Sequence, residues 1–139
     1  MWHTIIIVGN LGKDPEMRYT PNGQAVTSFS VASSRQYTNN QGQVVKETAW
    51  FRVSAWGKQA ETCNQYLKKG SKVLVEGRLT PDQSGNPRTF TRQDGTSGAS
   101  FEVNAQTVRF LSSRQDDGGA GSMGSEDIAP MSADEEIPF

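Results

Sequence analysis

The segment from Trp50 to Trp56 alternates strictly between two kinds of side chain, and it constrains the fold more than any other part of the sequence. Successive side chains of a β-strand point to opposite faces. One set is apolar and predicts a face turned toward a core: Phe51, Val53 and Ala55. The other set predicts an outward face: Trp50, Arg52, Ser54 and Trp56. Two outward tryptophans are an unusual use of surface.

Flat aromatic rings with a guanidinium group between them suit the stacking of successive bases of a single strand. On this interpretation Trp50 and Trp56 are stacking platforms and Arg52 binds a phosphate. The alternative is that this second face packs against another sheet or another subunit.

Further strands are predicted where β-branched and aromatic residues lie between turn signals. They cover residues 3–8, 25–37, 49–57, 72–80, 86–93 and 99–111. Two prolines and an Asn-Gly pair predict a loop over residues 13–23, while residues 39–42 and 94–95 predict hairpin turns. The adjacent apolar residues Ala25 and Val26 interrupt the alternation and predict a bulge or bend.

Residues 58–69 change period, because Ala60, Cys63 and Leu67 recur at three- and four-residue spacing before Gly70. This pattern predicts one short helix after the third strand. Several short strands with one interposed helix predict an all-β fold, namely an OB-fold: a five-stranded Greek-key barrel with one short helix.

Basic and aromatic residues also recur on single faces of other predicted strands. Arg35 and Tyr37 share one parity, and Arg88, Phe90 and Arg92 alternate along a later strand. Arg78 adds another cation. Isolated exposed arginines are usually only solvated, but three strands with such residues predict a binding groove for a polyanion.

Charge divides the chain into two parts. Residues 1–115 hold all 14 Lys and Arg and 8 of the 15 acidic residues, a net charge of +6, whereas residues 116–139 hold 7 acids and no Lys or Arg, a net charge of −7. We therefore predict three regions: an OB-fold domain over 1–111, a disordered Gly/Ser/Asp linker over 112–133, and an acidic tip over 134–139. The tip predicts a partner-docking peptide: Asp134, Glu135, Glu136, Ile137, Pro138 and Phe139.

Catalysis and metal binding find little support. His3 is the only histidine and Cys63 the only cysteine, so neither a histidine-based triad nor a cysteine-based zinc site is expected. No cofactor, no metal ion and no enzymatic activity are predicted. The N-terminal apolar run spans four residues, too few for a signal peptide or a membrane span.

Five segments, taken in order, resemble bacterial single-stranded DNA-binding proteins: residues 7–15, 18–23, 50–53, 56–58 and 66–71. The tip is similar to the C-terminal peptide of that family. The resemblance implies a homotetrameric OB-fold protein of the bacterial cytoplasm and nucleoid that binds single-stranded DNA without strong sequence preference. It also implies that the tip docks on replication, recombination and repair proteins.

Matched by position, the resemblance implies base stacking by four residues: Tyr37, Trp50, Trp56 and Phe90. It implies phosphate contacts by four more: Arg35, Arg52, Lys58 and Lys69. The sequence departs from the family at Phe51, where many members have a histidine associated with subunit contacts, and at Thr4, where a basic residue is common.

Three other functions remain as alternatives. An OB-fold module for RNA would use the same outward rings, since stacking does not depend on the sugar. A structural oligomer would bury the aromatic faces between subunits. A nuclease is the least supported of the three.

Overall fold

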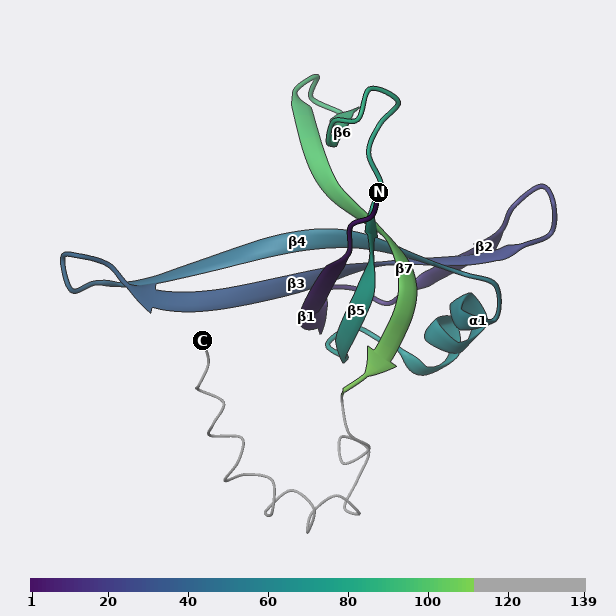
Figure 1. Ribbon diagram of the computed structural model, residues 1–139, viewed down its shortest axis with the longest axis horizontal. Helices are drawn as coiled ribbons and strands as arrows, with labels where there is room; N and C mark the ends of the chain where they lie inside the picture. Colours follow the sequence, from purple (N-terminus) through teal and green to yellow (C-terminus); the bar gives the residue numbers. More distant parts are fainter. Residues whose placement is uncertain (112–139) are drawn as a thin grey trace, which may run out of the picture.

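The computed structural model describes residues 1–111, which form a β-barrel with two projecting hairpins and one helix (Figure 1). The predicted linker, 112–133, and the predicted tip, 134–139, lie outside the described residues. In chain order the elements are β1 (Ile5–Leu11), β2 (Glu16–Tyr19), β3 (Ala25–Thr38), β4 (Val44–Trp56), α1 (Gly57–Tyr66), β5 (Lys72–Leu79), β6 (Arg88–Thr91) and β7 (Ser97–Phe110).

Five strands close the barrel in the order β1-β5-β7-β4-β3, because β1 also pairs with β3 at Asn10 and Leu11. The pairing of β4 with β7 is parallel and the other pairings are antiparallel. One helix stands between the third and fourth barrel strands. The prediction of an OB-fold, a five-stranded barrel with one short helix, is confirmed.

The core lies inside the barrel and consists mainly of valines from the inward faces of its strands. Val31, Val53, Val73 and Val75 are completely buried. Cys63 of α1 packs into the same cluster, and burial raises the pKa of its thiol to about 11. Because Val53 and Ala55 are buried while Trp50 and Trp56 are exposed, the predicted division of β4 into two faces is confirmed.

Several predicted boundaries are wrong. The predicted loop 13–23 contains β2, which pairs with the start of β3. The strand expected from residue 49 begins at Val44, and the helix expected to reach residue 69 ends at Tyr66. The helix ends early because Leu67 has an extended backbone, and β4 begins early because its polar residues pair with β3.

The bulge predicted at Ala25 and Val26 is also wrong. The register of β3 is continuous there against both β2 and β4. Ala25, Val26 and Thr27 are all buried, so both faces of β3 are covered at this end. Helix α1 packs against β3, and the Thr27 hydroxyl donates a 2.6 Å hydrogen bond to the Ala60 carbonyl. A register shift occurs instead in the β5–β7 pairing, where Glu76 pairs with Thr107 and Gly77 with Ala105, so that Gln106 of β7 is the extra residue.

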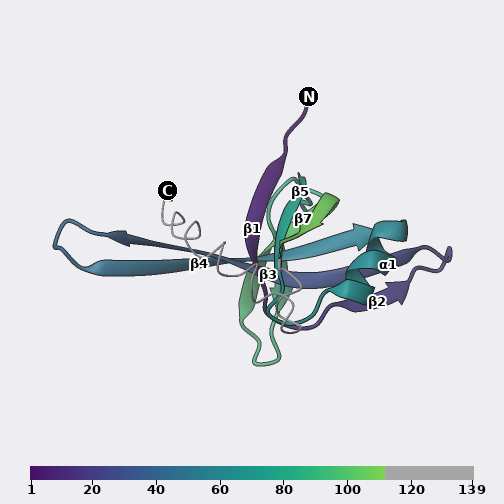
Figure 2. The same ribbon diagram turned by 90° about the horizontal axis from the view of Figure 1, so that it is seen from below.

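Two long hairpins leave the barrel in different directions (Figures 1 and 2). The β3–β4 hairpin turns at residues 39–43, where the Asn39 side chain accepts hydrogen bonds from the backbone N–H groups of Gln41 and Gln43. The β6–β7 hairpin turns at residues 92–96, with Gly95 at a φ of 90°. Hydrogen bonds from the Thr96 hydroxyl and backbone lower the pKa of Asp94 in this turn. Both predicted turns are confirmed.

Barrel closure depends on a close approach at Gly9. A Cβ atom at this position would lie 2.2 Å from the Ala32 carbonyl oxygen, which is backbone and cannot move aside alone. We predict that Gly9→Ala lowers the free energy of unfolding by about 1–3 kcal/mol through overpacking. Urea denaturation followed by circular dichroism measures this, with Lys46→Ala in the exposed β3–β4 hairpin as the control, expected within about 0.5 kcal/mol of wild type. Equal stability of the Gly9 variant and wild type would contradict the proposed closure.

Candidate nucleic-acid interface

A groove of about 460 Å³ opens on the outer side of the barrel where β4, β6 and β7 meet. It brings together three of the predicted site residues, Trp50, Arg52 and Phe90. Trp50 is 52% exposed and Phe90 is 47% exposed. The remaining lining residues come from β3, β4 and β7: Ser30, Phe51, Ala99, Ser100 and Glu102. The groove therefore combines two accessible aromatic rings with a polar floor.

Trp50 is held against the backbone at Gly12. A Cβ atom on Gly12 would lie 2.6 Å from Cζ3 of the Trp50 ring, so only glycine leaves room for this packing. In the β3–β4 ladder Trp50 pairs with Ala32, whose small side chain leaves the ring accessible. The sequence analysis did not identify Gly12 as part of the site.

Phe90 is held in a similar way on the β6–β7 hairpin. It pairs with Gly98, and a Cβ atom there would lie 2.6 Å from the edge of the Phe90 ring. The Arg92 guanidinium lies 5.3 Å from the centre of that ring, and its Nη1 donates a 2.7 Å hydrogen bond to the Ser97 carbonyl. The predicted basic and aromatic face of this strand thus forms a cation–π pair.

The floor of the groove is a row of polar residues from three neighbouring strands. Ser30 of β3 pairs with Arg52 of β4, which pairs with Glu102 of β7. Directly paired residues lie on the same face of a sheet, so the three side chains are neighbours. The Ser100 hydroxyl donates a 2.9 Å hydrogen bond to Glu102, and Arg88 lies 3.9 Å from the same carboxylate.

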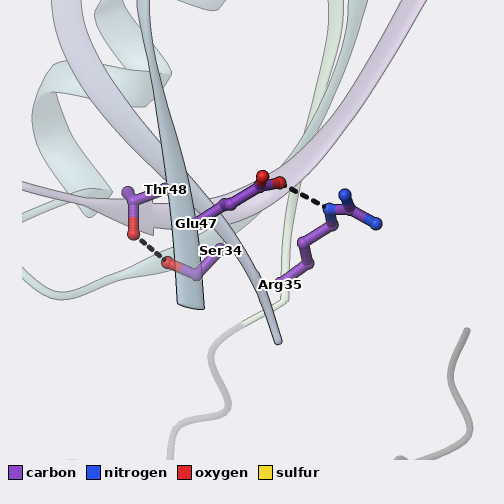
Figure 3. A network of polar contacts seen from close by, with 4 residues as sticks. All are labelled: Ser34, Arg35, Glu47 and Thr48. Carbon is purple, nitrogen blue, oxygen red and sulfur yellow. Dashed lines mark hydrogen bonds and ion pairs between the residues drawn. The ribbon is translucent and has the colours of Figure 1, made fainter. Parts of the chain in front are cut away.

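Arg35 and Tyr37 lie on the β3–β4 hairpin, outside this groove. Figure 3 shows the ion pair between Arg35 Nε and Glu47 Oε1 at 2.8 Å, beside a hydrogen bond between Ser34 and Thr48. The Arg35 guanidinium also lies 4.7 Å from the centre of the Tyr37 ring. Both residues have the parity opposite to that of Ala32, the partner of Trp50, so they lie on the other face of the ribbon.

Trp56 and Lys58 lie at the far end of β4. Trp56 shares the outward parity of Trp50 and is 36% exposed, and it immediately precedes α1. The two tryptophans are six positions apart along the strand, a distance of about 20 Å, so they cannot stack on the same base. Lys58 is exposed on the first turn of α1.

Lys69 and Arg78 lie on other parts of the surface. Lys69 is exposed between α1 and β5, and its backbone N–H donates a 2.8 Å hydrogen bond to Asp14. Arg78 lines a second groove of about 500 Å³ that also includes His3 and Asn104. It pairs with Asn104, which pairs with Ser54 of β4, so Arg78 belongs to the same outer face.

The sequence analysis missed the polar lining of the groove. Ser30, Ser100 and Glu102 are ordinary strand residues whose role depends on which strands are neighbours. Within residues 1–111 no group of three or more His, Cys, Asp or Glu is placed to hold a metal ion. In the same part of the chain, the structure contains no helix that combines the length and the apolar character needed to cross a membrane.

Known proteins are similar to this chain in sequence. The chain is 38% identical over 115 residues to a single-stranded DNA-binding protein of Neisseria meningitidis, which covers 83% of this chain and 63% of that protein. It is 41% identical over 133 residues to a single-stranded DNA-binding protein of Bacillus cereus. That match covers 96% of this chain and 72% of the Bacillus protein. The chain thus spans less than two thirds of the Neisseria relative's length.

Two solved structures have a similar fold. A deletion mutant of the single-stranded DNA binding protein from Thermus aquaticus matches with a TM-score of 0.62 and 30% identity, over 81% of this chain and 51% of that chain. The Plasmodium falciparum SSB in complex with ssDNA matches with a TM-score of 0.64 and 21% identity. The match covers 81% of this chain and 96% of the Plasmodium chain.

The family comparison covers the whole described domain except Met1. Residues 2–111, most of the chain, match the single-strand binding protein family. The outward aromatic rings, the basic residues beside them and the five-stranded barrel are thus features of a domain whose ancestry is shared with these relatives. The chain belongs to the single-strand binding protein family.

Proposed function

We propose that this chain binds single-stranded DNA without strong sequence preference and protects it during replication, recombination and repair. The observation that carries the proposal is the groove that Trp50, Arg52 and Phe90 line together. Every base has a π-face, so stacking on such rings tolerates any sequence. The relatives at 38% and 41% identity, both named single-stranded DNA-binding proteins, support the same conclusion.

The proposed contacts extend from the groove over the outer face and the β3–β4 hairpin. Four aromatic residues stack on bases: Tyr37, Trp50, Trp56 and Phe90. Seven basic residues contact phosphates: Arg35, Arg52, Lys58, Lys69, Arg78, Arg88 and Arg92. Each neutralised phosphate releases counterions, which makes binding depend on salt concentration. No catalytic step is part of this proposal, and the proposed place of action is the cytoplasm, on the bacterial nucleoid.

We also propose that the chain assembles as a homotetramer. Strand β1 pairs with β5 along residues 5–10, but within residues 1–111 its other edge pairs with β3 only at Asn10 and Leu11. Ile6 and Val8 on this strand are 61% and 46% exposed. An exposed apolar strand with a partly unpaired edge favours pairing with another chain.

The tip, residues 134–139, is proposed to recruit partner proteins of replication, recombination and repair. Asp134, Glu135 and Glu136 place negative charge directly before the apolar residues Ile137, Pro138 and Phe139. A hydrophobic pocket surrounded by Lys or Arg suits such a peptide, since it buries the phenyl ring and pairs the terminal carboxylate. Pro138 fixes its own φ and restricts Ile137, which lowers the entropy lost on docking.

The stacking proposal predicts that Trp50→Ala and Trp56→Ala each weaken binding of a thymidine oligonucleotide by about 1–3 kcal/mol. Folding changes little, because both side chains are exposed. Fluorescence anisotropy of a labelled oligonucleotide measures the affinity. Tyr66→Ala is the matched control, since Tyr66 is a 63% exposed ring on α1 outside the groove, and its affinity is expected to equal that of wild type. Wild-type affinity in either tryptophan variant would remove that residue from the proposed site.

The assembly proposal predicts that placing lysines at Ile6 and Val8 dissociates the oligomer without unfolding the domain. Both side chains are exposed in the single chain, so the substitutions disturb no internal packing. Sedimentation equilibrium is expected to give the mass of four chains for wild type and a smaller assembly for the Ile6→Lys, Val8→Lys variant. A monomeric wild-type protein at all concentrations would contradict the proposal.

The tip proposal predicts that deletion of Pro138 and Phe139 abolishes binding to partner proteins, because the apolar anchor and its carboxylate are removed together. Affinity for single-stranded DNA is expected to stay the same or rise slightly, since the acidic tip competes weakly for the basic surface. Pull-downs with full-length and truncated protein measure the first effect. If the truncated protein retrieves the same partners, the tip is not the docking element.

A further inference from the structure

A second groove, of about 500 Å³, lies on the outer face of the barrel where the N-terminal segment, β5 and β7 meet. It is lined by His3, Arg78, Asn104 and Gln106 together with the segment 79–81. Among residues 1–111 no acidic side chain lines this groove, whereas Glu102 lines the first groove, that of Trp50 and Phe90. A groove with a cation and amide donors but no carboxylate suits an anion such as a phosphate.

The charge of Arg78 is available to a ligand. Within residues 1–111 its guanidinium makes no ion pair. Arg35 and Arg88 differ from it, since each of them is paired with a glutamate. An exposed arginine is by itself only solvated, so the assignment of this groove depends on the groups beside Arg78.

His3 supplies a directed hydrogen-bond donor in the same groove. Its Nε2 accepts a 3.1 Å hydrogen bond from the backbone N–H of Leu79, at the end of β5. A ring nitrogen that accepts a hydrogen bond carries no proton, so the proton of this ring is on Nδ1. Among residues 1–111 no group accepts a hydrogen bond from Nδ1. The bond to Leu79 therefore fixes the tautomer and leaves one N–H donor for a ligand.

The second groove continues the first along β7. Glu102 lines the first groove, and Asn104, two residues further and about 7 Å along the strand, lines the second. Asn104 pairs with Ser54 of β4 and with Arg78 of β5, so these three side chains lie on the same outer face as Arg52. A single strand held in the first groove can therefore cross β7 and reach the second groove without changing faces.

We propose that this second groove binds a backbone phosphate of the single strand, with Arg78 supplying the charge and the Nδ1–H of His3 donating a hydrogen bond to a phosphate oxygen. The proposal rests on the proposed function and adds His3, Asn104 and Gln106 to its contacts. The amides of Asn104 and Gln106 donate to the remaining phosphate and sugar oxygens. Because contacts to phosphate and sugar carry no direct sequence information, this groove accepts any base sequence.

Anisotropy of a labelled oligonucleotide of about 16 thymidines, the upper end of the site size for one OB-fold, measures binding to the full chain at several salt concentrations. Arg78→Gln is expected to lower the affinity about fivefold at about 0.1 M salt. It is also expected to reduce the slope of log affinity against log salt by about 0.7, the value for one phosphate. His3→Ala removes a hydrogen bond but no charge, so its affinity is expected to fall about threefold with an unchanged salt slope.

Arg109→Gln is the matched control for charge. Arg109 is another exposed arginine of the outer face, but it pairs with Leu74 near the end of β7 and lies outside both grooves. This variant removes the same charge, and its affinity and salt slope are expected to equal those of wild type.

Nuclear magnetic resonance of the imidazole ring separates a phosphate contact from a merely structural role of His3. His3 is the only histidine of the chain, so in nitrogen-15-labelled protein the ring nitrogen resonances report on this residue alone. The free protein is expected to show the tautomer with the proton on Nδ1. Saturation with the oligonucleotide is expected to shift the Nδ1 resonance, whereas a histidine that only holds Leu79 would keep its resonances unchanged.

Three outcomes would overturn the second groove as a phosphate site. They are a wild-type salt slope in Arg78→Gln, equal effects of the Arg78 and Arg109 variants, and His3 resonances that do not change when the oligonucleotide is bound. Failure of wild type to bind the oligonucleotide at any salt concentration would instead contradict the proposed function itself.

Discussion

The pairing of β3 with β4 is the constraint on which the rest of the structure depends. Thirteen consecutive residue pairs join Val26–Thr38 to Val44–Trp56. Because side chains alternate, a shift of one residue in this register would turn Trp50 and Arg52 into the barrel and Val53 out of it. The burial of Val53 and Ala55 in a core of packed valines therefore fixes the exposure of the tryptophans.

Closure of the barrel then brings together residues that are distant in sequence. Strand β7 pairs with β4, β5 and β6, so Glu102 of β7 lies beside Arg52 of β4, and Phe90 of β6 lines the same groove as Trp50. Glycines make the close packing possible, since Gly12 lies under the Trp50 ring and Gly98 lies against the Phe90 ring. The outer surface thus combines stacking and cationic groups, and each has a distinct proposed role toward a single strand.

The sequence predicted the fold class, the two faces of β4 and both hairpin turns, because alternation and turn residues are local signals. The sequence prediction failed where tertiary contacts determine the structure. Strand β2 forms by pairing with β3, and both faces of β3 are covered near Val26 by neighbouring elements that include α1. Within the site, Trp50, Arg52 and Phe90 were predicted, whereas Glu102 was not, since its place in the groove depends on the parallel β4–β7 pairing. Tyr37 and Trp50 lie on opposite faces of the β3–β4 hairpin. This follows from the register of the two strands, which the sequence alone leaves open.

The central claim is that a single strand lies in the groove between Trp50 and Phe90. Photo-crosslinking with a thymidine oligonucleotide that contains 5-iododeoxyuridine, followed by mass spectrometry, tests it most directly, because crosslinking favours rings in stacking contact with the base. We expect crosslinks at Trp50 and Phe90. Crosslinks confined to Tyr66 and Phe110, whose rings form a separate exposed pair 6.3 Å apart beside α1, would contradict this account.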